Sequence, residues 1–235
     1  MFDLDFALPS ECARQLAAGE TDIGIVPVAA LLDGEYEIFR GTGIACHGAV
    51  RTILLISKVP FGEIRSVAMD AGSRSSVMLT RIILQQAYGV EPEWHTQPAD
   101  MVAMLSTADA CLIIGDPALR LDPEALRNQG FQVADLGEEW LKLTGLPMVF
   151  AVWAGRKDTH TADRERAFID SYEFGKQHIE AIVQAEYEAR GVAAALVREY
   201  LTRYIVFELG DKEYEGMDLY LSNVKRIKEQ VLARK

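Results

Sequence analysis

Short apolar runs rich in β-branched residues alternate, along the first two thirds of the chain, with segments in which apolar residues recur every three or four positions. The run at residues 2–8 (FDLDFAL) is followed by a helical pattern at 10–19 and by a second apolar run at 21–32. This alternation is typical of βαβ units and predicts an α/β fold with a parallel sheet. Ser10 is expected to cap the first helix, and Gly19 to end it.

A second series of the same kind follows. It predicts strands at 51–60, 64–70 and 90–95, a helix at 75–89, and a helix followed by a strand at 99–119. Residues 17–31 and 105–119 echo each other, because each has a helix end, an aspartate, an apolar strand and a proline-containing turn. Either any two αβ turns look alike, or the chain forms two similar lobes with a ligand cleft between them.

The last third of the chain is patterned as helices at 163–190, 192–209 and 217–235, the first of them capped by Thr161 or Asp163. These helices are expected to cover a sheet. Periodicity does not distinguish an intramolecular face from a surface between two copies, so a homodimer stays open.

Charge and composition narrow the class of function. With 35 acidic against 24 basic residues and a net charge of −11, the surface repels a phosphate backbone, and nucleic acid is excluded as a partner. The three cysteines lack metal-type spacing and are interpreted as reduced thiols in the cytoplasm. No signal peptide and no apolar stretch of about 18 residues is present, so we expect neither export nor a membrane span.

The turn DAGSRSSV carries the most suggestive chemistry, because it joins a predicted strand to the helix at 75–89. Free backbone N–H groups at a helix start bind anions, and Ser73, Ser75 and Ser76 add hydroxyl groups while Arg74 adds a cation. The alternative is an ordinary helix start with serines that cap it locally. The spacing of a Walker loop is absent, so a nucleoside triphosphate is not implied.

Further candidates lie at the ends of other strands. His47 and Arg51 lie in a glycine-rich loop, although each is also typical of an exposed surface position. Gly115 and Asp116 follow a buried-type strand, where Asp116 before a proline equally marks a helix start. A Thr144–Gly145 turn precedes an apolar strand, while Trp140, Phe150 and Trp153 are expected in the core. No catalytic triad, HExxH motif or diagnostic acid pair is present, so residue types alone name no reaction.

Several segments together resemble a known family. They are PSECARQLAAGETDIGIVPVAALL, GAVRTILLIS, DAGSRSSVMLTRIIL, ADACLIIGDPAL, DLGEEWLKLTGLPMVFAVWAGR and YLTRYIVFELGDKEYEGMDLYLS. Over nearly all of its length the chain resembles the chorismate dehydratases of the futalosine route to menaquinone. The resemblance implies a two-lobed fold like that of type II periplasmic binding proteins, acting in the cytoplasm without a cofactor or metal. One lobe would comprise residues 1–57 and 153–235, and the other residues 58–152.

The implied reaction eliminates water from chorismate to give 3-[(1-carboxyvinyl)oxy]benzoate. Chorismate is a dicarboxylate, which helix N-termini can hold in a globally acidic protein. Under this hypothesis Ser73, Ser75 and Ser76 bind a carboxylate, His47 and Arg51 line the facing wall, and Asp116, Thr144 and Gly145 complete the cleft. Two alternatives stay open: a non-catalytic carboxylate-binding or effector domain, and the sister enzyme that makes dihydroxynaphthoate.

One departure from the family concerns the N-terminus. Relatives begin with a further strand and helix carrying a Ser-Tyr-Leu-Asn type motif, whereas this sequence starts at what corresponds to the second strand. The resemblance therefore implies a missing first strand and helix, with apolar residues such as Phe6, Ile23 and Ile25 left uncovered. Either the start codon is assigned too late, or this form is shortened and inactive.

Overall fold

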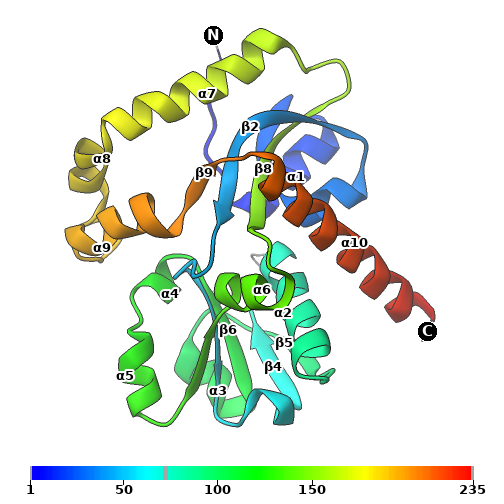
Figure 1. Cartoon of the computed structure of the whole chain (residues 1–235), viewed down its shortest axis with the longest axis vertical. Coiled ribbons are helices and arrows are strands. Elements are labelled where there is room, and N and C mark those ends of the chain that lie inside the picture. The colour runs from blue at the N-terminus through cyan, green and yellow to red at the C-terminus, as the bar shows by residue number, and fades with distance from the viewer. Residues whose placement is uncertain (1, 71–73, 234–235) are drawn as a thin grey trace.

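The computed structural model describes residues 2–70 and 74–233, which form two lobes, each built on one sheet (Figure 1). The sheet of the first lobe has the order β1 (Ile23–Pro27), β8 (Met148–Arg156), β2 (Tyr36–Cys46), β9 (Val206–Glu208). The sheet of the second lobe has the order β5 (Glu93–Thr96), β4 (Ser66–Met69), β6 (Ala110–Ile114), β3 (Ile53–Ser57), β7 (Gln132–Asp135). The α/β class and the two-lobed architecture are as the sequence predicts.

The chain crosses between the lobes at 47–52 and again at 145–147. These crossings differ from the boundaries expected at 57/58 and 152/153. Strand β3 pairs with β6 and β7 of the second lobe, and β8 pairs with β1 and β2 of the first lobe from Met148 onward. Both strands are apolar throughout, so the pattern locates them but does not show which sheet they join.

The sheet of the second lobe is mixed, and that of the first lobe is antiparallel. Strand β4 runs parallel to β5 and β6, as the βαβ pattern predicts. All pairs in the first lobe, and both pairs of β3, are antiparallel. The prediction of a parallel sheet is therefore wrong for the first lobe, because β8 returns from the second lobe and inserts between β1 and β2.

Helices cover both sheets. In the second lobe they are α2 (Arg74–Ala87), α3 (Met101–Thr107), α4 (Asp116–Leu119), α5 (Pro123–Asn128), α6 (Leu136–Thr144) and the 3₁₀ turn η2 (Phe61–Glu63). In the first lobe they are α1 (Pro9–Ala18), the 3₁₀ helix η1 (Val28–Asp33), α7 (Ala162–Gln177), α8 (Ile179–Glu186), α9 (Ala194–Glu199), the π-helical turn η3 (Tyr200–Tyr204) and α10 (Asp211–Ala233). None of the helices within the described residues is long and apolar enough to cross a membrane.

Helix ends follow the local rules in part. Gly19 ends α1 in the left-handed conformation, and the Thr161 side chain accepts a hydrogen bond from the Arg164 N–H at the start of α7. The prediction of Ser10 as a cap is wrong, because Leu8 is the N-cap and Pro9 occupies the first helical position. The segment 192–209 is predicted as one helix, but its helical part ends at Tyr204 and the chain continues as β9.

Residues 2–8 form no strand, contrary to the prediction from their alternating pattern. Leu4, Phe6 and Leu8 are 73%, 92% and 71% exposed. Within the described part of the chain, β1 pairs only with β8, and no strand pairs with residues 2–8. An alternating segment becomes a strand only where a partner edge receives its backbone hydrogen bonds.

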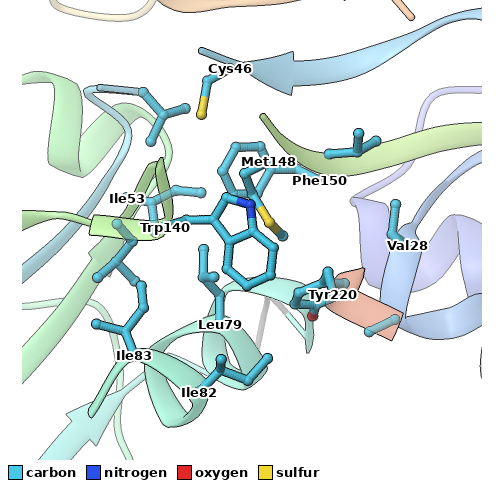
Figure 2. Close-up of a cluster of buried hydrophobic side chains, with 14 of the residues drawn as sticks. Val28, Cys46, Ile53, Leu79, Ile82, Ile83, Trp140, Met148, Phe150 and Tyr220 are labelled. Atoms are coloured by element: carbon cyan, nitrogen blue, oxygen red, sulfur yellow. The ribbon is translucent and has the colours of Figure 1, made fainter. Parts of the chain in front are cut away.

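The largest apolar cluster spans both lobes and surrounds Trp140, which is fully buried (Figure 2). The Trp140 indole N–H donates to the Pro147 carbonyl in the second crossing at 3.1 Å, and its ring meets Tyr220 of α10 edge-on. Leu79 of α2 and Met148 of β8 belong to the same cluster. The core therefore fixes α2, α6, α10 and the second crossing relative to one another.

Candidate functional site

The first turn of α2 lies at the boundary between the lobes. Ser75 is 2% exposed, and its Oγ accepts a hydrogen bond from the Ala29 N–H of η1 at 3.3 Å. Its carbonyl accepts the Tyr220 hydroxyl of α10 at 3.0 Å. Because a serine hydroxyl that accepts still carries its own proton, Ser75 retains the capacity to donate. The first turn contains no acidic residue, so no side chain there opposes an incoming anion.

The other members of the serine-rich turn are placed only in part. Ser76 is buried, and its carbonyl accepts the Thr80 hydroxyl at 2.7 Å. Ser73 lies outside the described residues, as does the side chain of Arg74, whose backbone begins α2.

The Thr144–Gly145 turn lies at the end of α6, which packs against α2. The Thr144 hydroxyl donates to the Trp140 carbonyl at 2.8 Å and accepts the Leu146 N–H at 3.1 Å. Gly145 takes a φ of 73°, which a residue with a side chain adopts only with strain. The buried Trp140–Tyr220 contact links this turn to Ser75, so the two predicted segments belong to one region.

Arg51 occupies the first crossing under backbone strain. Its φ of 65° is unusual for a residue other than glycine. One guanidinium nitrogen, Nη2, donates to the Leu121 carbonyl at 3.1 Å, while Nη1 is buried without a hydrogen-bond partner within the described residues. A buried cationic donor with no acceptor is costly, and strain of this kind gathers at functional sites.

Gly115 and Asp116 follow β6 and lie beside the first crossing. The Gly115 N–H donates to the Thr52 carbonyl at 2.8 Å, and Asp116 pairs with Arg190 at 3.1 Å. Asp116 begins α4 with Gly115 as its N-cap, which agrees with the helix-start interpretation. Strand β6 runs parallel to β4 with Leu112 beside Met69, so α4 and α2 follow strands that end at the same edge of the sheet.

His47 begins the first crossing, directly after β2. Its side chain is 53% exposed and its Nε2 contacts a carboxylate oxygen of Glu213 at the start of α10. Glu213 also accepts the Gly210 N–H at 2.8 Å. Burial acts to raise the pKa of Glu213, but these hydrogen bonds outweigh burial and the pKa is lowered. The contact joins the first crossing to α10.

Asp135 is not among the residues predicted from the sequence, although it organises the first crossing. Its buried carboxylate accepts N–H groups from Val50 and Arg51 in the crossing and from Gly137 and Glu138 in α6. Burial raises its pKa, an effect that these four hydrogen bonds reduce without reversing. An aspartate directly before a helix signals a cap, but nothing in the sequence signals the two contacts to a loop more than 80 residues away.

A cavity of about 610 Å³ has none of the ten candidate residues in its wall. It lies in the first lobe, between the sheet and helices α7 and α8.

Comparison with known proteins identifies the family. The family model described as menaquinone biosynthesis matches residues 2–226. The chain belongs to this family. It is 28% identical over 213 residues to the chorismate dehydratase of Thermus thermophilus, which covers 84% of this chain and 78% of that relative.

Solved structures confirm the fold of this family member. A protein of Archaeoglobus fulgidus superposes with a TM-score of 0.65 at 20% identity, covering 96% of this chain and 84% of that one. The periplasmic aliphatic sulphonate-binding protein SsuA of Escherichia coli superposes with a TM-score of 0.60 at 19% identity, covering 97% and 77%. The chain therefore has the two-lobed fold of type II periplasmic binding proteins.

Proposed function

We propose that this member of the menaquinone biosynthesis family is a chorismate dehydratase. The observation that carries the proposal is the family match over residues 2–226, together with the similarity to the Thermus thermophilus enzyme over most of both chains. The chemistry of the lobe boundary supports it, because the start of α2 offers hydrogen-bond donors and no acidic side chain in its first turn.

The proposed reaction loses the C4 hydroxyl and the C3 proton of chorismate as one molecule of water and leaves 3-[(1-carboxyvinyl)oxy]benzoate. The C3–H electron pair becomes part of the new aromatic ring as the C4–O bond breaks. Since aromatisation supplies much of the driving force, the protein's task is to orient the dianion, exclude bulk water and assist the departure of the proton and hydroxyl.

We assign one substrate carboxylate to the first turn of α2. The Ser75 hydroxyl and backbone N–H groups at the start of the helix would donate to it. The Thr144–Gly145 turn and Ser76 are candidates for the same end of the substrate, and Ser73 and Arg74 stay candidates from the sequence. Arg51, Gly115, Asp116 and His47 are candidates for the remaining contacts to the substrate. Among them Arg51 is favoured, because its Nη1 has no acceptor within the described residues.

The test is to incubate the purified protein with chorismate and to follow the aromatic product by chromatography and ultraviolet absorbance. Formation of the enol ether of 3-hydroxybenzoate supports the proposal. Tight binding of chorismate without turnover would instead identify a binding or effector domain. Conversion of a cyclic futalosine derivative to dihydroxynaphthoate would identify the sister enzyme.

A further inference from the structure

The cavity of about 610 Å³ in the first lobe has the size of a small-molecule site. Its wall is mainly apolar and rich in aromatic rings, with Ile25, Trp153, Phe168, Tyr172 and Phe207 among its members. Trp153 and Phe168 stack with their centroids 4.2 Å apart. The 16-residue helix α7, which forms one side, contains no buried residue. Helix α7 touches the sheet through Phe168 and leaves the cavity beside that contact.

Among the polar residues that line the cavity, Thr42 of β2 is the buried one. The strand is irregular here, with register shifts against both β8 and β9, so Thr42 does not follow a regular pleat. Thr42 is 4% exposed and lines the cavity, and its Oγ1 is buried without a hydrogen-bond partner within residues 2–70 and 74–233. A buried hydroxyl without a partner is unfavourable, and a guest that supplies one removes that cost.

Charges at the wall indicate the charge of the guest. Lys176 lies 3.7 Å from Glu173 and 3.5 Å from Glu208, so its ammonium is already matched by two carboxylates. Of these, Lys176 and Glu208 line the cavity. The two charged residues of the wall, Lys176 and Glu208, cancel, so an anion gains little attraction, and any ion would lose its hydration against an apolar wall. A neutral guest avoids this cost.

We propose that this cavity binds a neutral, mainly apolar molecule with an aromatic or alicyclic ring system and one hydroxyl or carbonyl group that pairs with the Thr42 hydroxyl. The site is separate from the ten candidate residues, and chorismate does not fit it because chorismate is a dianion. The proposal therefore stands or fails independently of the dehydratase activity.

The test uses 1-naphthol and naphthalene as a matched pair of probes, with equilibrium dialysis against the full chain. We expect both to bind and 1-naphthol to bind more tightly. Thr42→Val keeps the shape of the side chain and removes its hydroxyl. This substitution should weaken the binding of 1-naphthol by roughly 2- to 12-fold, the range of a neutral hydrogen bond. The affinity for naphthalene should be unchanged.

A filling variant tests the location. Gly175 lies in α7 and lines the cavity, and a Cβ built there meets only the Ile182 Cδ1 atom, at 3.9 Å. Gly175→Leu should abolish binding of both probes, while the control Gly175→Ala should fold with at least wild-type stability and retain binding, since alanine favours a helix more than glycine does.

Any one of the following results would overturn the proposal. They are failure of both probes to bind the wild type, wild-type binding by Gly175→Leu, an unchanged 1-naphthol affinity in Thr42→Val, and displacement of 1-naphthol by chorismate. A dimeric wild type that becomes monomeric on Gly175→Leu would show that a second copy fills the cavity, which would also overturn it.

Discussion

Ser75 holds hydrogen bonds to η1 and α10, and its hydroxyl can still donate, so its replacement tests the proposed role of the start of α2 at the scale of one residue. We predict that Ser75→Ala lowers kcat/KM for chorismate by about 10- to 150-fold, because a hydrogen bond to a charged group contributes roughly 1.5–3 kcal/mol. Steady-state kinetics, run below the unfolding temperature of the variant, provide the measurement.

The control for this substitution is Ser106→Ala. Ser106 is exposed on α3 and its hydroxyl donates only to the carbonyl of Ala103 in its own helix. Its turnover should equal that of the wild type. Equal kcat/KM for Ser75→Ala and Ser106→Ala would remove Ser75 from the site.

The cysteines give a second test at this scale. Burial raises the pKa of Cys111 to about 12 and that of Cys46 still further, whereas Cys12 is only half-buried and its pKa is raised less. Since the thiolate is the reactive form, we predict that iodoacetamide at pH 8 labels Cys12 first in the native protein and all three cysteines in urea. Mass spectrometry of peptides measures the order, and early labelling of Cys46 or Cys111 would contradict the described packing.

Single residues were predictable where the reason is local. Gly19 and Thr161 end and begin helices through contacts within a few residues, and the sequence predicts both. Asp135 and Arg51 take their roles from each other across 84 residues, with the Arg51 N–H donating to the Asp135 carboxylate at 2.6 Å. The spacing of apolar residues does not reveal a partner so far along the chain. The backbone strain at Arg51 and the burial of the Asp135 carboxylate were therefore not predictable from the sequence.

At the scale of elements, Asp135 connects α6 to the first crossing. We predict that Asp135→Ala costs about 3–5 kcal/mol of unfolding free energy, the sum of a lost helix cap and of two buried N–H groups without partners. Asp122 is the matched control, because it caps α5 through the Glu124 and Ala125 N–H groups in an exposed position. Asp122→Ala should cost about 1 kcal/mol. Urea unfolding measures both, and similar losses would show that the contacts to the crossing contribute nothing.

Asp135 also predicts a pH dependence. Because burial raises its pKa in the folded state above the ordinary value of about 3.9, the folded protein binds this proton more tightly than the unfolded chain does. The contribution of Asp135 to the unfolding free energy therefore falls as pH rises from about 3.9 through the folded pKa. Asp135→Asn does not titrate, so the wild-type value minus the Asn variant's value should fall across this window. A difference that grows with pH would contradict the assigned direction.

Helices and strands were predictable where the apolar pattern is long. They were less predictable where strand pairing determines the structure of a short segment. The helix at 75–89 and the strand at 51–60 correspond to α2 and β3. Residues 2–8 alternate as a strand does but have no partner edge within the described residues, and 206–208 follow a helical pattern but pair with β2. In both places tertiary pairing overrides the local pattern.

At the scale of the whole molecule, the two-lobed fold was predictable from the resemblance to a known family. Both crossings lie N-terminal to the expected boundaries, because β3 joins the second sheet and β8 the first. The start of α2 and the Thr144–Gly145 turn are linked through the core around Trp140, and Gly115 and Asp116 follow β6, the strand beside β4. The sequence indicates these strand and helix ends but not which strands are neighbours in the sheet, so the candidate site stays a prediction.

We propose that this family member dehydrates chorismate at the start of α2. The most direct measurement is the rate at which the purified chain forms 3-[(1-carboxyvinyl)oxy]benzoate from chorismate, compared between the wild type, Ser75→Ala and Ser106→Ala. We expect product with the wild type and with Ser106→Ala, and a rate reduced at least tenfold with Ser75→Ala. Wild-type protein that is folded, binds chorismate and forms no product, or a Ser75→Ala variant as fast as the wild type, would contradict this proposal.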